Sequence, residues 1–301
     1  MPASKNAATD VSMNVPMNAT GPILLITDLS PRCDRAMDRA AAMAQAHGVP
    51  LIALHVMDTP WLTKLAQPAW RSMQQSHIAQ AQARLSSDLS HLHQIQTTML
   101  VETGNPVEVI NRVANEHQCC LIVSGTARDE TLGRIVLGNT VERLARRTTT
   151  PLLVVRARPF TPYAKVVVAT DFSEGSRQAL VTALALCRGA DLTLYHAFAA
   201  VAGIYQLDNP TVAEETQALH KKANKFVAAT PGFTQKQLPT VIEHGLAEQA
   251  LPAFAAAQSV DLVVMGTLGA TGIVHTAMGS VAEKLLTALR CDVMIVPQTA
   301  Q

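Results

Sequence analysis

Short apolar runs alternate with longer mixed stretches along most of the chain, and each run ends at polar residues or at glycine. Residues 22–30 read PILLITDLS and residues 165–173 read KVVVATDFS, so both runs close on Thr-Asp-x-Ser. An apolar run of this length that is rich in β-branched residues indicates a buried strand, and the Asp and Ser are placed to cap a following helix. We therefore expect two strands here, with helices over residues 32–47 and 174–188.

The two runs open an internal repeat whose members lie 141 residues apart for most of its length, as Gly48 and Gly189 do. These two glycines are each expected to close the preceding helix. Further apolar runs that pair in this way are 51–56 with 192–197, 99–104 with 240–245, 121–125 with 262–266, and 152–155 with 293–296. Helical patterns between them pair as well, 69–91 with 212–228 and 106–117 with 247–258.

Each half therefore consists of five predicted strands separated by helices. Connections long enough for a helical crossover predict parallel strands. The predicted fold class is α/β, with two tandem doubly wound domains, each a five-stranded parallel sheet of order 3-2-1-4-5 flanked by helices. The expected domains are residues 21–157 and 158–301, after a disordered lead-in at residues 1–20. Two prolines and two arginines interrupt the pattern at residues 156–163 and mark the boundary.

Composition narrows the class of protein. Of the 301 residues, 48% are hydrophobic, which allows each half a sizeable core. The formal net charge of +1 gives no electrostatic signature of a nucleic-acid or anionic-membrane partner. No apolar run is long enough to span a bilayer, and residues 1–20 lack a signal-peptide layout. The five cysteines lack CxxC spacing and are interpreted as reduced, buried thiols, so we expect a cytoplasmic protein.

A glycine-rich loop follows the fourth predicted strand of the second half. Residues 266–280 read GTLGATGIVHTAMGS, with the spacing Gly-x2-Gly-x9-Gly-Ser. Glycines at a strand end let a ligand approach the backbone without a Cβ in the way. The last Gly and Ser open a helix, expected over residues 281–289, whose unpaired amides and dipole favour phosphate. Ser280 is suited both to cap this helix and to donate its hydroxyl to a phosphate. Asp171, at the end of the first strand, faces this loop across the switch point of the sheet, where ligands of such folds bind.

This loop and Asp171 resemble the ATP-binding members of the universal stress protein family, and the resemblance covers residues 21–297. It implies that the second half binds ATP or another adenine nucleotide, with or without Mg²⁺. Asp171 would contact the adenine or ribose side, the backbone of residues 195–198 would read the adenine edge, and the motif residues would line the ribose and hold the phosphates. Those motif residues are Gly266, Gly269, Gly279, Ser280 and Val281. The alternative is a glycine loop that merely turns a strand into a helix.

The same loop in the first half departs from the motif. Arg128 stands in place of the middle glycine and Asn139 in place of the serine, and two acids, Asp129 and Glu130, follow the arginine. An arginine fills the space that a glycine leaves open, and acidic side chains repel a triphosphate. We expect this half to have lost ATP and to serve as a scaffold or pairing partner. An altered anionic ligand is the alternative.

No catalytic residue and no protein metal site is predicted. ATP hydrolysis needs a base or water-orienting group and a cation at the γ-phosphate, but no basic residue lies between Gly266 and Glu283. His91 and His93 do not share a helix face, and His275 is interpreted as a loop residue. The expected role is ligand-dependent regulation in the stress response. The alternatives are a nucleotide-free interaction or scaffold protein and a weak ATPase.

The resemblance also implies that the two halves pair within one chain, largely through their fifth strands at residues 152–155 and 293–296. Both strands are short and wholly apolar. An exposed strand of that kind is an aggregation hazard, so burial against its counterpart is favoured. Association of two chains into a homodimer is a further expectation from the habit of the family.

Overall fold

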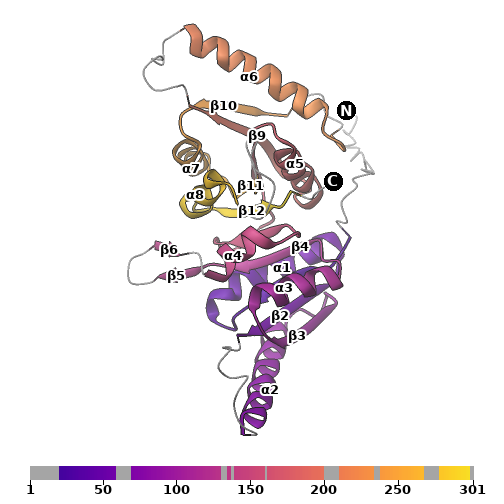
Figure 1. Ribbon diagram of the computed structural model, residues 1–301. Helices are drawn as coiled ribbons and strands as arrows, with labels where there is room; N and C mark the ends of the chain where they lie inside the picture. Colours follow the sequence, from indigo (N-terminus) through magenta and orange to yellow (C-terminus); the bar gives the residue numbers. More distant parts are fainter. Residues whose placement is uncertain are drawn as a thin grey trace, which may run out of the picture.

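The computed structural model describes residues 20–58, 69–129, 134–136, 139–159, 161–199, 210–233, 238–267 and 278–298, in which strands and helices alternate (Figure 1). The main elements of the first half are β1 (Ile23–Thr27), α1 (Asp34–His47), β2 (Leu51–Met57), α2 (Ala69–Leu89), β3 (Thr97–Thr103), α3 (Pro106–Glu116), β4 (Leu121–Gly125), α4 (Asn139–Arg147) and β7 (Leu152–Val155). Those of the second half are β8 (Lys165–Ala169), α5 (Glu174–Leu186), β9 (Asp191–Phe198), α6 (Pro210–Ala228), β10 (Thr240–His244), α7 (Ala247–Ala257), β11 (Leu262–Gly266), α8 (Ser280–Ala288) and β12 (Asp292–Val296).

The strands of the two halves join into one ten-stranded sheet, in the order β10-β9-β8-β11-β12-β7-β4-β1-β2-β3. Each half follows the predicted order 3-2-1-4-5, and neighbouring strands within a half are parallel. The prediction of an α/β fold with two doubly wound halves is confirmed. Parallel strands covered on both faces are expected to be almost continuously apolar, as the six central strands β8, β11, β12, β7, β4 and β1 are.

The two halves meet through their fifth strands, as predicted. β7 and β12 pair antiparallel, with Val154 opposite Val293 and Leu153 opposite Met294. All four side chains are fully buried. These apolar strand edges, which would promote aggregation if they were exposed, are therefore paired with each other within the chain.

Helices cover both faces of this sheet. α1, α2, α5 and α6 pack on one face, and α3, α4, α7 and α8 pack on the other. Successive residues of a strand point to opposite faces, so Leu25 belongs to the first core and Leu24 to the second. Each core contains residues of both halves and therefore runs across the junction. None of the described helices is both long and apolar enough to cross a membrane.

The starts of the first helices differ between the halves. In the second half Ser173 caps α5 as predicted, accepting a hydrogen bond from the amide of Ser176 at 3.3 Å. In the first half a short 3-10 turn, η1 (Pro31–Cys33), precedes α1, and Ser30 makes no side-chain capping bond. The capping role predicted for Ser30 is therefore wrong, because the turn that begins at Pro31 displaces the start of the α-helix.

The ends of these helices differ as well. Gly48 closes α1 in the left-handed conformation, with a φ of 64°, as predicted. α5 already ends at Leu186 with Cys187 as its C-cap, so Gly189 lies beyond the helix end. Gly189 still adopts a positive φ of 80°, which places it in the turn toward β9 rather than in a helix cap.

The first-half loop forms a structure that the sequence did not predict. Within residues expected to be loop, β5 (Ala127–Asp129) and β6 (Arg134–Val136) pair antiparallel as a two-stranded sheet of their own. Figure 1 shows this hairpin projecting from the first half, away from the main sheet. Arg128 therefore belongs to a strand. Gly138, the glycine that the motif shares with the second half, lies outside the described residues.

A buried polar cluster fixes the connection between the halves. Asp292, fully buried at the start of β12, accepts hydrogen bonds from the amide of Arg156 at 2.7 Å and the hydroxyl of Tyr163 at 2.6 Å. Arg39 of α1 forms an ion pair with Asp292 at 3.7 Å and stacks 3.9 Å from the centre of the Tyr163 ring. The buried guanidinium of Arg156 donates to two carbonyls near the end of α8. The segment that interrupts the sequence pattern is thus anchored at its two ends, by the buried side chains of Arg156 and Tyr163.

Candidate functional site

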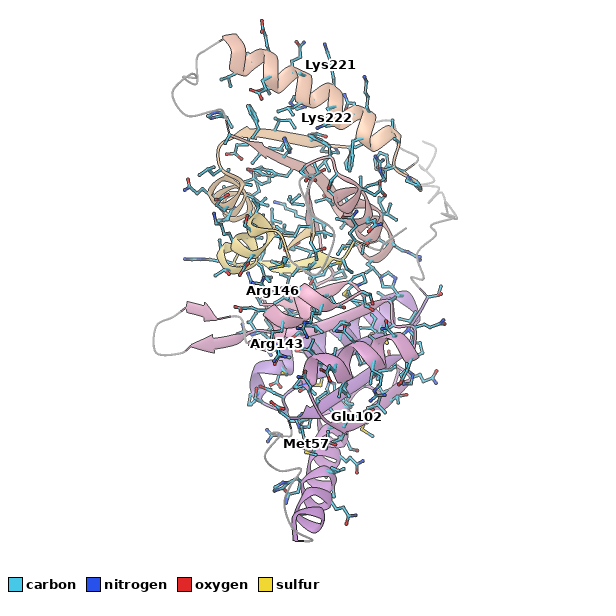
Figure 2. All side chains as sticks on the ribbon, in the orientation of Figure 1. Met57, Glu102, Arg143, Arg146, Lys221 and Lys222 are labelled. Atoms are coloured by element: carbon cyan, nitrogen blue, oxygen red, sulfur yellow. The ribbon has the colours of Figure 1, made fainter. Side chains whose placement is uncertain are left out.

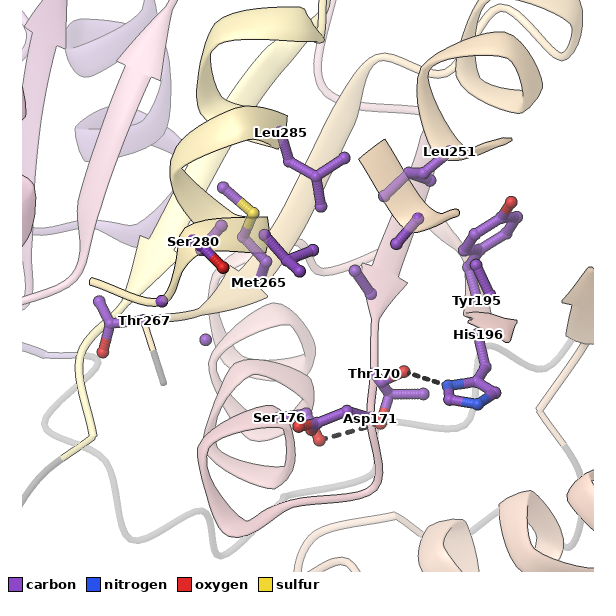
Figure 3. A pocket seen from close by; sticks show the side chains of 17 residues that line it. Thr170, Asp171, Ser176, Tyr195, His196, Leu251, Met265, Thr267, Ser280 and Leu285 are labelled. Carbon is purple, nitrogen blue, oxygen red and sulfur yellow. Dashed lines mark hydrogen bonds between the residues drawn. The ribbon is translucent and has the colours of Figure 1, made fainter. Parts of the chain in front are cut away.

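A pocket of about 440 Å³ opens at the carboxyl ends of β8 and β11, the switch point of the second-half sheet (Figure 3). The predicted binding residues that line it are Asp171, Gly266, Gly279, Ser280 and Val281. Gly269, the remaining predicted residue, lies outside the described residues. Figure 3 shows Ser280 on one side of the pocket and His196 on the other, with Asp171 on the loop that follows β8. The fold therefore brings together residues that lie far apart in the sequence.

The loop after β8 holds Asp171 in a defined turn. The hydroxyl of Thr170 accepts a hydrogen bond from the amide of Phe172 at 2.9 Å, and the Asp171 carboxylate accepts one from the amide of Ser173 at 3.0 Å. Between them Phe172 has a φ of 63°, which a residue other than glycine adopts only where its surroundings enforce it. Leu29 repeats this geometry after β1, with a φ of 62°. The shared Thr-Asp-x-Ser motif therefore encodes a specific turn in both halves.

The N-terminus of α8 meets the pocket without a side-chain cap. Gly279 is the N-cap residue, and its amide donates to the carbonyl of Thr267 at 2.8 Å. Ser280 is the first residue of the helix, so the expectation that Ser280 caps α8 is wrong. The first turn of a helix leaves amide groups without intrahelical partners, and Ser280 and Val281 of this turn line the pocket. This end of the pocket is suited to an anion.

The two described glycines of the motif serve different purposes. A Cβ on Gly266 would lie 2.9 Å from backbone atoms of Gly175, so Gly266 is required for the close packing of β11 against α5. A Cβ on Gly279 would meet only the carbonyl of Thr267, at an ordinary 3.5 Å. Gly279 also has a φ of −61°, which any residue adopts. The fold therefore explains Gly266 but gives no reason for a glycine at position 279.

The walls of the pocket are largely apolar. The aliphatic and thioether side chains that form them are Ala169, Ala197, Ala247, Leu251, Met265, Ala282 and Leu285. They come from β8, β9, α7, β11 and α8, so several elements of the second half enclose the same space. An apolar slot with few polar groups at its ends suits a flat, largely apolar ring.

Two ionisable side chains of β9 border this slot. His196 hydrogen-bonds the carbonyl of Thr170 through Nδ1 at 2.7 Å, and in its neutral form Nδ1 is the donor. Burial lowers the pKa of His196, and Lys222 adds to this effect, against the opposing effects of the Thr170 carbonyl and Asp171. Tyr195 donates to Glu243 at 2.6 Å, and burial followed by this hydrogen bond raises the pKa of Tyr195. Both side chains are thus held neutral at neutral pH.

The first half has a smaller pocket at the equivalent place, of about 220 Å³. Asp28, Cys33 and Gly125 are among its lining residues. The thiol of Cys33 donates to the Asp28 carboxylate at 3.1 Å, and burial raises the pKa of Cys33 to about 11. All five cysteines are free thiols. Cys119, Cys120 and Cys187 are buried as predicted, whereas Cys33 and Cys291 are only partly buried.

Sequence reasoning missed the role of Thr170, which is the buried hub of the turn. Besides accepting from the amide of Phe172, its hydroxyl donates to the hydroxyl of Ser176 at 2.9 Å. Thr27 is the equivalent in the first half and accepts from the amide of Leu29 at 2.9 Å. The recurrence of Thr before Asp in both halves was the signal that could have identified it. Among the described residues, no cluster of His, Cys, Asp and Glu is placed to hold a metal ion.

Comparison with known proteins gives consistent matches over both halves. The model of the universal stress protein family matches residues 20–156 and 162–297. The chain is 25% identical over 289 residues to a universal stress protein of Mycolicibacterium smegmatis, which covers 91% of this chain and 96% of that protein. It is 23% identical over 297 residues to universal stress protein E of Salmonella typhi, covering 91% and 93%. The solved structure of a universal stress protein from Archaeoglobus fulgidus superposes with a TM-score of 0.68 at 18% identity, covering 93% of this chain and 99% of that one.

Proposed function

The chain belongs to the universal stress protein family, and we propose that its second half binds an adenine nucleotide, with ATP as the expected ligand. The observation that carries this proposal is the composition of the second-half pocket. An apolar slot, a carboxylate and the uncapped N-terminus of a helix border one cavity of about 440 Å³. These are the chemical complements of a base, a ribose and phosphates, respectively.

Each part of the nucleotide has a counterpart in this arrangement. The base would occupy the apolar slot beside residues 195–198, and the ribose would lie near Asp171. The phosphates would accept from the first amides of α8 and from the hydroxyl of Ser280. Gly279 supports the same assignment, since no described residue would contact a Cβ there more closely than 3.5 Å. A phosphate that approaches this backbone would explain the glycine.

The nucleotide is proposed as a regulatory ligand in the stress response rather than as a substrate. Among the described residues that line the pocket, none is Lys or Arg. Hydrolysis of ATP needs a cation near the γ-phosphate and a group that orients water. A Mg²⁺ ion would be bound mainly by the nucleotide phosphates, since the described residues offer no ligand cluster of their own.

The first half is proposed as the scaffold of the second. The space at its equivalent place is divided into a pocket of about 220 Å³ and a more open one of about 500 Å³, both bordered by Asp28, and a hairpin forms where the second half has a glycine-rich sequence. Both hydrophobic cores run through the junction, so the first half contributes directly to the stability of the second.

The test uses the purified full-length chain. An acid extract analysed by chromatography is expected to contain adenine nucleotide, and ATP at about 100 times Kd should add about 2.7 kcal/mol to the free energy of unfolding. Gly279→Val should abolish this stabilisation, because a branched side chain would occupy the phosphate position. The matched control is Gly138→Val in the first half, which should leave it unchanged. No nucleotide in the extract together with no effect of ATP on the melting temperature would overturn the proposal.

A further inference from the structure

An arginine of the first half reaches the helix that borders the second-half pocket. Arg146, in the last turn of α4, forms a salt bridge of 2.6 Å with Glu283, in the first turn of α8. Both side chains are partly exposed, at 36% and 47%. Figure 2 shows Arg146 at the boundary between the two halves, while Arg143 lies farther from it on the same helix. The contact therefore links the scaffold half to the element that begins at Ser280.

This contact has no charged counterpart on the other side of the junction. The offset of 141 residues that relates the halves makes Thr287 the equivalent of Arg146, and Glu142 the equivalent of Glu283. The symmetric contact would thus place a threonine, not an arginine, opposite Glu142. Among the described residues, this arginine therefore reaches toward the half whose loop retains the Gly-x2-Gly-x9-Gly-Ser spacing, and the equivalent position on the other side of the junction carries no cation.

Glu283 occupies a position that would disfavour phosphate if it were unpaired. It follows Ser280 by three residues, and residues with this spacing lie side by side on one face of a helix, with Cβ atoms about 5–6 Å apart. A carboxylate there competes with a ligand anion for the positive end of the helix and repels it. The guanidinium of Arg146 neutralises that carboxylate from across the junction.

We propose that Arg146 is a positioning residue through which the first half sets the phosphate affinity of the second half. The inference rests on the proposed function, because it concerns the phosphate end of the same pocket. Arg146 acts by holding Glu283 in an ion pair, so that the N-terminus of α8 presents a net positive field to the phosphates. Nucleotide binding in the second half is thereby tied to docking of the first half.

The size of the effect follows from the exposure of the pair. Charges separated by a few ångströms near a protein surface interact weakly but measurably, and salt screens them. Loss of Arg146 is expected to weaken ATP binding about 3- to 10-fold at low ionic strength. The effect should be smaller for AMP, which carries less charge, and absent for adenosine. It should shrink as salt rises toward 1 M, where the screening length is about 3 Å.

Calorimetric titration of the full-length chain with adenosine, AMP and ATP tests this. Arg146→Ala should weaken ATP binding as stated, whereas Glu283→Gln should bind ATP at least as tightly as the unmodified chain, since it removes the repelling carboxylate. Arg147→Ala is the matched control, because Arg147 is the exposed neighbour in the same turn of α4, and it should change little. The charge-swapped double variant Arg146→Glu with Glu283→Arg should recover most of the ATP affinity that Arg146→Glu alone loses.

The results of this titration distinguish a failure of the inference from a failure of the proposed function. If the unmodified chain binds ATP but Arg146→Ala and Glu283→Gln weaken it equally, the pair only holds the halves together and the inference is overturned while the proposed function stands. Equal losses for adenosine and ATP in Arg146→Ala would overturn it in the same way. If the unmodified chain binds none of the three ligands, the proposed function itself fails, and the inference fails with it.

Discussion

Arg39 Nε lies 3.7 Å from the fully buried carboxylate of Asp292, so one ion pair joins α1 of the first half to β12 of the second. The same carboxylate accepts from Tyr163 and from the amides of Arg156 and Ala157, in the segment that connects the halves. Burial and Asp292 together raise the pKa of Tyr163 well above its usual value, so its hydroxyl remains a donor. Helix α1 and the connecting segment thus both contact the Asp292 side chain of β12.

Asp292→Asn tests how much the contacts of this carboxylate contribute to the stability of the protein. The substitution leaves Arg39 and Arg156 buried beside a neutral amide, so we expect a loss of about 3–5 kcal/mol in the free energy of unfolding. Urea denaturation followed by circular dichroism measures it. Asp191→Asn, at an exposed carboxylate at the start of β9, should change the same quantity by less than about 0.5 kcal/mol. Equal urea midpoints for the two variants would show that the polar cluster around Asp292 does not stabilise the junction.

Substitution of Gly266 should affect the stability of the fold, whereas substitution of Gly279 should affect ATP binding. Gly266→Ala places a Cβ 2.9 Å from the backbone of Gly175 and should destabilise the fold by about 1–3 kcal/mol. Gly279→Ala meets only ordinary contacts and should leave stability unchanged or raise it slightly, while it lowers ATP affinity. Thermal denaturation without ligand and titration with ATP measure the two effects. A strongly destabilised Gly279→Ala would contradict this division.

Protonation of His196 should lower the free energy of unfolding in mild acid. Its pKa is lowered in the folded state, chiefly by burial, from a usual value of 6.5. The unfolded chain therefore binds a proton first, so this contribution is complete above pH 6.5 and is lost as the pH falls from 6.5 toward the folded pKa. The difference in unfolding free energy between the unmodified chain and His196→Gln, measured from pH 8 to pH 5, should decline over that window. A difference in unfolding free energy that stays constant from pH 8 to pH 5 would show that His196 does not cause this pH dependence.

The cysteines should be protected from alkylation in the native chain. Burial raises the pKa of Cys119 and Cys187 to about 12, and that of Cys33, Cys120 and Cys291 to about 11. Because the thiolate is the nucleophile, a rise of two pKa units lowers the reactive fraction about 100-fold at pH 8. Mass spectrometry after a short iodoacetamide pulse should find little labelling before urea is added and full labelling afterwards. Rapid labelling of the native chain at any of these positions would contradict its burial.

The strands and their order were predictable because buried parallel strands leave an unambiguous apolar run. The repeat then gave two independent views of each element. The pairing of residues 152–155 with 293–296 was implied by the family resemblance and supported by their apolar character. The pocket was predictable for a related reason, since Asp171 and Gly266 lie at the ends of neighbouring strands, and Gly279, Ser280 and Val281 begin the helix that follows. Sequence spacing was enough to bring them together.

The features that sequence reasoning missed depend on tertiary contacts. Arg156 lies in a stretch whose prolines and arginines predict a domain boundary, yet its side chain is buried, because its guanidinium donates to carbonyl acceptors at the end of α8. Gly266 was assigned to the ligand, although packing against Gly175 already requires it. The strand at Ala127–Asp129 is too short and too polar to stand out in the sequence. The bridge from Arg146 to Glu283 joins residues of different halves, which no local pattern reveals.

The antiparallel pairing of β7 with β12 also determines how the two halves respond to dilution. Two separate single-half chains joined by such strands would dissociate as their concentration falls. Here the connection between the halves is covalent and short, so each half meets its partner at an effective concentration that does not depend on the amount of protein. The nucleotide site proposed for the second half therefore keeps one fixed companion half, and its binding is expected to saturate at one nucleotide per chain at any protein concentration.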